Sequence, residues 1–240
     1  MASKPTGEQY HAAALAAIEK KDIKNAFALF YTGAVEGDAD CQFWIGSFYA
    51  RGMIVKKSER EALKWFRKAA KQDHTGAMNE VGLLYANGKD VQHSPELAMK
   101  WVSAAALKGS PGAVYNLATF YESGTGCEVD HERAAKLYML ADKANFPAAS
   151  YRLATMYRFG CGVETDVKKS FELCKKAADG GYNEALLDLA MFYRDGEAVE
   201  KDLDAALSYA RKARDAGVQG SDAVVEEIEK LKSSAGTESA

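Results

Sequence analysis

The sequence predicts an all-α fold, a solenoid built from a continuous array of helix-turn-helix units. The first observation is a period of 36 residues, which holds without an insertion from residue 22 to residue 217. Periods of about 20–50 residues are typical of solenoids, whose units bury a core only by stacking on their neighbours. The second observation is that several columns keep this period in phase. A tyrosine recurs at Tyr49, Tyr85, Tyr121, Tyr157 and Tyr193, and a glycine follows it at Gly52, Gly88, Gly124, Gly160 and Gly196.

The first helix of each unit is predicted from its start signals and its apolar stripe. Its apolar residues, such as Trp65 and Phe66, recur at the three- and four-residue spacing of one helical face. Pro95 occupies a first helical position, where its missing N–H does no harm. Ser58 with Glu61 forms the sequence pattern of a capping box. Residues that favour the N-cap begin every unit: Asp22, Ser58, Ser94, Asp130, Asp166 and Asp202.

A second helix follows in each unit and ends at the recurring glycine. One column on this helix contains only small residues, which let two helices approach closely. That column is Gly46, Gly82, Ala118, Ala154 and Ala190. Between the two helices, the chain places glycines that suit a left-handed C-terminal cap at Gly109, Gly181 and Gly217.

The unbroken register predicts one solenoid domain over residues 8–231. It begins with a capping helix over residues 8–20. Residues 1–7 and the small, polar tail 232–240 are expected to be disordered. The expected units span residues 22–57, 58–93, 94–129, 130–165, 166–201 and 202–231.

These columns resemble the Sel1-like repeat (SLR) family, a relative of the tetratricopeptide repeat proteins. The family pattern A-x-x-W-[FY]-x-x-A-A is present from Ala62 to Ala70, and A-x-x-x-L-G-x-x-Y is matched from Ala77 to Tyr85 with Val81 in place of leucine. The resemblance covers roughly residues 22–217. It implies a right-handed α/α superhelical solenoid of about six repeats that serves as a protein-interaction adaptor or scaffold.

The chain departs from the family pattern in some of its loops and in its last unit. The family loop G-x-G-V-x-x-D has a second glycine, and the loops that contain Ile54 and Ala198 lack it. In the last unit, Glu226 and Glu229 replace the small residue and the tyrosine. Polar residues there are expected of a helix that caps the end of a solenoid.

Composition and charge argue against two classes of partner. The chain has 31 Lys+Arg, 34 Asp+Glu and a formal net charge of −3, whereas nucleic-acid binders of this size are more often basic. No apolar run approaches the roughly 18 residues that suggest a transmembrane helix. Residues 1–9 lack the pattern of a signal peptide. We therefore expect no nucleic-acid partner, no integral membrane segment and a cytoplasmic location.

The four cysteines do not have the pattern of a disulfide framework. Cys41, Cys127 and Cys174 replace apolar residues in core columns, and Cys161 lies in a variable loop column. Some secreted bacterial members of the family carry a cysteine pair in every repeat, and this chain carries none. A reducing compartment is therefore expected.

No motif has the spacing of a catalytic or metal-binding site. H-E-x-x-H, C-x-x-C, G-x-S-x-G and S-x-x-K are absent, and the segment Gly124-Thr125-Gly126 lacks the third glycine and the lysine of a phosphate loop. The histidines fall in different columns, so they are not expected to converge on a metal. We expect a non-enzymatic protein without a cofactor or a metal.

The second helices are expected to line a concave groove, as the resemblance to tetratricopeptide arrays implies. Aromatic residues and arginine are enriched at interaction hot spots, and arginine binds carboxylates bidentately. We expect the groove to bind a peptide or helical segment of a partner protein. Thr155, Asp188 and Met191 share the groove columns. The candidate residues are Phe43, Trp44, Asn79, Leu83, Tyr115, Asn116, Thr119, Tyr151, Arg152, Arg158 and Arg194.

Several alternatives remain open. Tyr115 and Tyr151 are equally suited to pack between adjacent helices. Lys64, Lys100 and Lys136 form a row on the first helices, which is either a solvated face or a surface for an acidic partner or a membrane. The chain is expected to be a monomer, and self-assembly by end-to-end stacking is the alternative. Some cysteine-rich family members are reported as weak β-lactam-binding enzymes, but this chain lacks their periodic cysteines and a serine–lysine motif.

Overall fold

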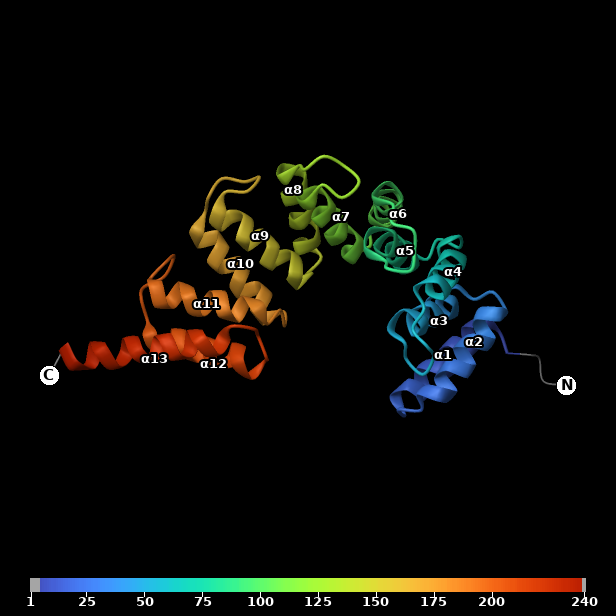
Figure 1. Ribbon diagram of the computed structural model, residues 1–240, viewed down its shortest axis with the longest axis horizontal. Coiled ribbons are helices and arrows are strands. Elements are labelled where there is room, and N and C mark those ends of the chain that lie inside the picture. The colour runs from blue at the N-terminus through green and yellow to red at the C-terminus, as the bar shows by residue number, and fades with distance from the viewer. Residues whose placement is uncertain (1–4, 239–240) are drawn as a thin grey trace. The chain divides into compact units, whose positions relative to one another are not determined.

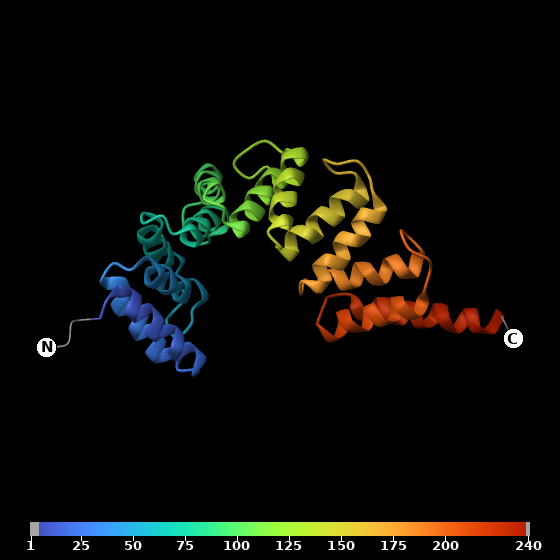
Figure 2. The ribbon, with the colours of Figure 1, turned by 180° about the vertical axis from the view of Figure 1, so that it is seen from behind.

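The computed structural model describes residues 5–238, with side chains through residue 234, and Figures 1 and 2 show it from opposite sides. The described residues form thirteen α-helices and no β-strand, which confirms the all-α prediction. The chain divides into two compact units, Met1–Val129 and Asp130–Ala240. Within each unit, every helix packs against the next helix in the chain (Figure 1).

The helices follow the predicted alternation. The even-numbered helices are the predicted first helices, and the odd-numbered ones from α3 to α11 are the predicted second helices. The first unit contains α1 (Gly7–Glu19), α2 (Ile23–Val35), α3 (Ala39–Arg51), α4 (Glu59–Ala70), α5 (Thr75–Asn87), α6 (Pro95–Leu107) and α7 (Pro111–Ser123). The second contains α8 (His131–Lys143), α9 (Pro147–Phe159), α10 (Val167–Asp179), α11 (Glu184–Asp195), α12 (Leu203–Asp215) and α13 (Ser221–Glu238).

Side chains at the predicted N-cap positions begin the even-numbered helices. Each accepts a hydrogen bond from a backbone N–H of the first turn, which satisfies a group that has no partner within the helix. The prediction of a full capping box at Ser58 is wrong. Ser58 Oγ accepts from Glu61 N at 3.2 Å, but the Glu61 carboxylate turns to Lys64 Nζ at 2.6 Å instead of returning to the cap.

The small residues of the second helices permit the predicted close approach. A Cβ added to Gly46 would lie 2.5 Å from the Phe66 ring, and one added to Gly82 would lie 2.5 Å from Val102 Cγ2. Contacts this short do not occur between real side chains, so these glycines are required by packing. The alanines of the same column are fully buried: Ala118, Ala154 and Ala190.

In four of the five loops after the second helices α3–α11, the residue at the second glycine of the family pattern is left-handed; the residue in the fifth loop, Asp90, is not. Gly126 and Gly162 adopt φ values of 72° and 70° there. Ile54 and Ala198 occupy the equivalent positions with φ values of 55° and 67°. These two side chains therefore adopt a backbone conformation that glycine tolerates far better.

Each unit has its own apolar core. Phe30 and Phe48 are buried among α1–α3, and Phe66 is buried where α4 meets α3 and α5. At the other end of the chain, Val225 and Ile228 of α13 are buried against α12. The last helix thus covers the apolar face of α12, as expected of a cap.

Both ends are more regular than the sequence predicted. Thr6, inside the segment 1–7 that was expected to be disordered, is the N-cap of α1 and forms a capping box with Gln9. Helix α13 continues to Glu238, although residues 232–240 were expected to form a disordered tail. Ser234 Oγ donates to the carbonyl of Lys230 at 3.1 Å, a bond that polar side chains form within a helix. Residues 1–4 and 239–240 lie outside the described residues.

Candidate functional site

The predicted groove residues all lie on second helices. Phe43 and Trp44 are on α3, and Asn79 and Leu83 on α5. The residues on α7 are Tyr115, Asn116 and Thr119, those on α9 are Tyr151, Arg152 and Arg158, and Arg194 is on α11. Helices α3, α5 and α7 belong to one compact unit, and α9 and α11 belong to the other.

The aromatic candidates of the first unit are half-buried in helix packing. The Phe43 ring stacks on His74, with centroids 4.6 Å apart, and contacts Phe66 at 5.6 Å. Trp44 stacks on Phe30 at 5.1 Å. These rings are therefore occupied by neighbouring helices and offer little free surface to a partner.

A line of polar groups connects α5 and α7. Asn116 Nδ2 donates to Asn79 Oδ1 at 2.8 Å, and Asn79 in turn is hydrogen-bonded to the Glu80 carboxyl, whose pKa burial raises while Arg51 opposes the rise. Thr119 Oγ1 donates to the carbonyl of Asn116 at 2.7 Å. These side chains are held in place by one another, and this network was not predicted.

Tyr115 and Leu83 complete the first group. Tyr115 is half-buried and is not free of partners. Leu83 lines a small hollow of about 180 Å³ with Glu80. This hollow is smaller than most ligand sites, which begin at about 300 Å³.

A larger hollow of about 280 Å³ lies among α9, α10 and α11 in the second unit. It brings together two predicted residues, Tyr151 and Arg158, and the groove-column residues Thr155, Asp188 and Met191. Sequence analysis did not assign its remaining lining residues to a site. These are Phe159, Ser170, Cys174 and Phe192.

Asp188 is the electrostatic centre of this hollow. It is half-buried, and burial raises the pKa of its carboxyl, while the hydrogen bond from Tyr151 and the charge of Arg158 act in the opposite direction. Burial and the adjacent Asp188 also raise the pKa of the Tyr151 hydroxyl, which keeps this hydroxyl a donor. The Tyr151 ring contacts Tyr182 at 4.8 Å. Tyr151 therefore both packs between helices and fixes the carboxyl of Asp188.

Arg158 closes one side of the hollow. Its guanidinium lies 4.6 Å from the centre of the Phe192 ring and forms an ion pair with Glu197. A cation held over an aromatic face loses little freedom when it binds an anion. Arg158 is thus a fixed cation at the edge of a hollow whose other charged group is Asp188.

The cysteine of the hollow is not activated. Burial raises the pKa of the Cys174 thiol to about 12, so at neutral pH it is a thiol and not the nucleophilic thiolate. All four cysteines are free: Cys41 and Cys174 are buried, Cys127 is half-buried and Cys161 is exposed. This agrees with the prediction that three of them occupy core columns.

The remaining arginines lie apart from the hollow. Arg152 is exposed and does not line it. Arg194 binds Asp195 through two bonds of 2.7 and 2.8 Å and contacts Glu227 of α13 at 3.0 Å. Its guanidinium is therefore saturated by carboxylates of the same unit. Of the three predicted arginines, only Arg158 lines the hollow.

The sequence contained one unused signal for this site. Phe159 is 68% exposed at the rim of the hollow. The equivalent positions in the other repeats carry polar residues. These are Arg51, Asn87, Ser123 and Asp195. A large apolar residue in a polar column is not needed by the repeat and would have pointed to a binding surface.

The described residues lack two further features. No group of three or more His, Cys, Asp or Glu side chains within the described part of the chain is arranged to hold a metal ion. Among helices α1–α13 as described, none combines the length and the apolar character needed to cross a membrane.

Five segments of the sequence match the model of one family, described as Sel1 repeat. They cover more than half of the chain, and each begins at or close to the start of an odd-numbered helix, half a unit after the boundaries we predicted. The matched residues are 39–74, 75–110, 111–141, 147–182 and 183–218. A comparison with curated proteins finds no match.

Solved structures are similar over most of the chain. A Sel1 repeat protein from Oxalobacter formigenes is 25% identical, with a TM-score of 0.81 over 93% of this chain and 89% of that one. The protective antigen c5321 of uropathogenic Escherichia coli, which displays an SLR fold, is 26% identical, with a TM-score of 0.75 over 92% of this chain. The match spans only 48% of the c5321 chain. The immunity protein Pa5087 from Pseudomonas aeruginosa is 16% identical, with a TM-score of 0.59 over 90% of this chain and 83% of that one. At this identity the similarity shows a shared fold alone.

Proposed function

Because the chain belongs to the Sel1 repeat family, we propose that it is a non-enzymatic scaffold that binds a peptide or a helical segment of a partner protein. The hollow among α9, α10 and α11 is the anchoring point for one partner side chain. The observation that carries this proposal is the pairing of a half-buried carboxyl, Asp188, with an exposed aromatic rim, Phe159.

The size of the hollow favours a side chain over a whole small molecule. Its volume of about 280 Å³ is just below the roughly 300–1,000 Å³ of typical small-molecule pockets. Met191 and Phe192 provide apolar walls, and the Asp188 carboxyl accepts hydrogen bonds. We therefore expect an anchoring residue whose apolar body ends in a hydrogen-bond donor, such as tyrosine, tryptophan or lysine.

The protein's setting is part of the same proposal. Four free cysteines, two of them buried, suit a reducing compartment, so we place the protein in the cytoplasm. The scaffold is proposed to act as a monomer without a cofactor and without nucleic acid as a partner, in keeping with its net charge of −3.

Selection of peptides on the pure protein tests the proposal. A random peptide library displayed on phage is selected on the wild type, and enriched peptides are measured by calorimetry. We expect Asp188→Asn combined with Met191→Ala to weaken binding roughly tenfold or more, because the anchor loses a charged acceptor and an apolar wall. Glu172→Gln, an exposed change on α10 outside the hollow, should bind as the wild type does.

Two outcomes contradict the proposal. If the enriched peptides bind the double variant as tightly as the wild type, the anchor is not this hollow. If selection enriches no peptide at all, a peptide-binding scaffold is the wrong function. Circular dichroism of both variants confirms that a loss of binding does not reflect unfolding.

A further inference from the structure

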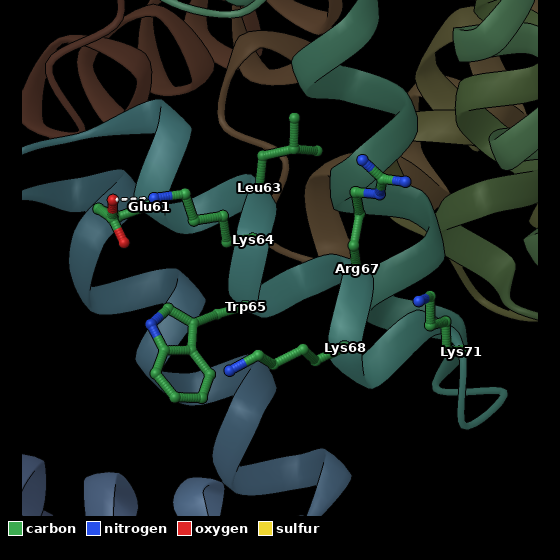
Figure 3. A pocket seen from close by; sticks show the side chains of 7 residues that line it. All are labelled: Glu61, Leu63, Lys64, Trp65, Arg67, Lys68 and Lys71. Carbon is green, nitrogen blue, oxygen red and sulfur yellow. Dashed lines mark hydrogen bonds and ion pairs between the residues drawn. The ribbon is translucent and has the colours of Figure 1, made fainter.

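The outer face of α4 carries a second hollow, of about 390 Å³, in the first unit. Figure 3 shows its lining: Trp65 on one side, and Leu63, Arg67 and Lys71 following one another along the helix. Lys68 Nζ lies 3.8 Å from the centre of the Trp65 ring. Four cations and one carboxylate, Glu61, line this surface, although the whole chain is slightly acidic.

Three of these cations have no carboxylate partner among the described residues. Lys64 pairs with Glu61 at 2.6 Å, but Arg67, Lys68 and Lys71 form no ion pair with any residue that the structure describes. They lie within little more than one helical turn, so their charges add instead of being compensated. Bringing them together costs free energy unless an anion is present.

The repeat itself shows that this cluster is not needed for folding. The repeat that contains α4 is the one repeat in which positions 64, 67, 68 and 71 and their equivalents are all basic. In α12 the same positions are Ser208, Arg211, Lys212 and Asp215, and in α10 they are Glu172, Lys175, Lys176 and Asp179.

Two of the equivalent cations are neutralised by partners, whereas Lys143, Lys175 and Lys212 form no ion pair with a described residue. Lys176 pairs with Asp142 at 2.7 Å, and Arg211 pairs with Glu229 at 2.7 Å. Lys176 is equivalent to Lys68, and Arg211 to Arg67. The cluster on α4 differs because it places together three cations that have no described carboxylate partner, with no acidic residue at any of the four positions.

Aromatic and other apolar side chains lie beside the cations. The Trp65 ring is half-buried and meets Tyr31 of α2 edge-on, with centroids 6.0 Å apart. Tyr31 is 45% exposed, and Val35, one turn further along α2, is 61% exposed. A ligand on this surface therefore meets both positive charge and aromatic surface.

We propose that this surface, formed by Trp65, Arg67, Lys68, Lys71 and Tyr31, binds an acidic peptide segment that contains an aromatic residue. Carboxylates of the segment pair with the three uncompensated cations, and its aromatic side chain packs on Tyr31 and Trp65. Charge complementarity selects this occupant. Three uncompensated cations are few for a nucleic acid, for which six to ten phosphate contacts are common. The apolar face of α4 is buried in the core and is not available to a membrane.

The test uses the whole protein and a short fluorescein-labelled peptide in which glutamates flank a single phenylalanine. Fluorescence anisotropy should show binding by the wild type that weakens as salt is added. Arg67→Glu with Lys71→Glu should weaken binding by roughly tenfold or more, since attraction becomes repulsion. Lys168→Glu with Lys175→Glu makes the same charge change on exposed positions of α10 and should leave binding unchanged.

Further measurements distinguish the kinds of ligand that this surface could bind. Replacing the phenylalanine of the peptide by serine should weaken binding, whereas equal binding would overturn the aromatic part of the proposal. Equal loss in both double variants would reduce the effect to net charge and overturn the site. Preferential binding to vesicles containing phosphatidylserine or to single-stranded DNA, lost on Arg67→Glu with Lys71→Glu, would overturn the peptide as occupant. No binding by the wild type would overturn the proposal altogether.

Discussion

Ile54 and Ala198 adopt the left-handed backbone that glycine adopts at the equivalent positions Gly126 and Gly162. Such a conformation costs a residue with a side chain about 1–2 kcal/mol, and a β-branched residue such as Ile54 is especially unsuited to it. Glycine removes this cost but makes the unfolded chain more flexible, which takes back about 0.4–1 kcal/mol. Because the first cost exceeds the second, glycine at either position is expected to increase the stability of the protein slightly.

Ile54→Gly is therefore expected to raise the free energy of unfolding by about 0.5–1 kcal/mol. Urea denaturation followed by circular dichroism measures the change. Ile54→Ala is the matched control, because it removes the same exposed side chain but keeps a Cβ in the left-handed conformation. An equal gain from both variants would show that the side chain, and not the backbone, was responsible.

Asp188→Asn should stabilise the protein in a pH-dependent way. Burial raises the pKa of the Asp188 carboxyl in the folded protein, so between its ordinary pKa and the raised one the folded state holds more protons than the unfolded state. The contribution of this group to the free energy of unfolding therefore falls as the pH rises through that window. Above the window, the full cost of burying the charged carboxylate remains. The asparagine variant avoids this cost at neutral pH and retains an acceptor for Tyr151.

Urea midpoints of the wild type and Asp188→Asn, measured from neutral to acidic pH, test this prediction. The advantage of the variant should be largest near neutral pH and should disappear below the ordinary pKa of an aspartate, about 3.9. Glu172→Gln, on an exposed position of α10, should show no comparable advantage. An advantage for Asp188→Asn that is constant with pH would mean that titration of this carboxyl does not contribute.

At the scale of the helices, replacing glycine by alanine is expected to have opposite effects at two positions. A Cβ at Gly82 would meet Val102 Cγ2 at 2.5 Å and the carbonyl oxygen of Ala98 at 3.1 Å, whereas nothing lies within 4 Å of a Cβ at Gly112. Gly82→Ala should cost about 1–3 kcal/mol through overpacking. Gly112→Ala should gain roughly 0.5 kcal/mol from helix propensity. Thermal unfolding of both variants checks the signs, and a stable Gly82→Ala variant would contradict the close approach of α5 and α6.

The helices were predictable because their signals are local and repeated. An N-cap such as Asp166 accepts a hydrogen bond from a backbone N–H of the same turn. A small residue such as Ala118 indicates a close helix contact that recurs from repeat to repeat. The candidate site was predicted only in part. The second helices were correctly chosen, but the partner of Arg158 is Glu197 and that of Asn116 is Asn79. These pairs depend on side-chain conformation across repeats, which spacing does not determine.

At the scale of the whole chain, the covered C-terminal face predicts a monomer. Helix α13 buries Val225 and Ile228 against α12 and presents carboxylates outward, of which Glu229 pairs with Arg211 at 2.7 Å. Light scattering over a concentration series should give a constant mass near 26.1 kDa. A mass that rises with concentration would instead support self-assembly by end-to-end stacking.

The repeat period predicted the architecture of the chain but not the ends. A 36-residue register specifies which faces are apolar in every interior unit. The residues around Thr6 and beyond Leu231 lie outside that register. Helix α1 begins with a capping box, and α13 continues through serines whose hydroxyls donate to backbone carbonyls. Composition alone described these segments as polar and small, which is equally true of a disordered tail and of a solvated helix end.

The most direct test of the peptide-binding scaffold is methyl NMR of the methionines during titration with a peptide selected on the wild type. Met191 lines the hollow among α9, α10 and α11, whereas Met139 on the neighbouring helix α8 does not. We predict that the Met191 methyl resonance shifts in a saturable way and that Met139 stays in place. A saturable shift at Met139 or in the first unit, with Met191 unchanged, would contradict the assignment of this hollow as the anchor.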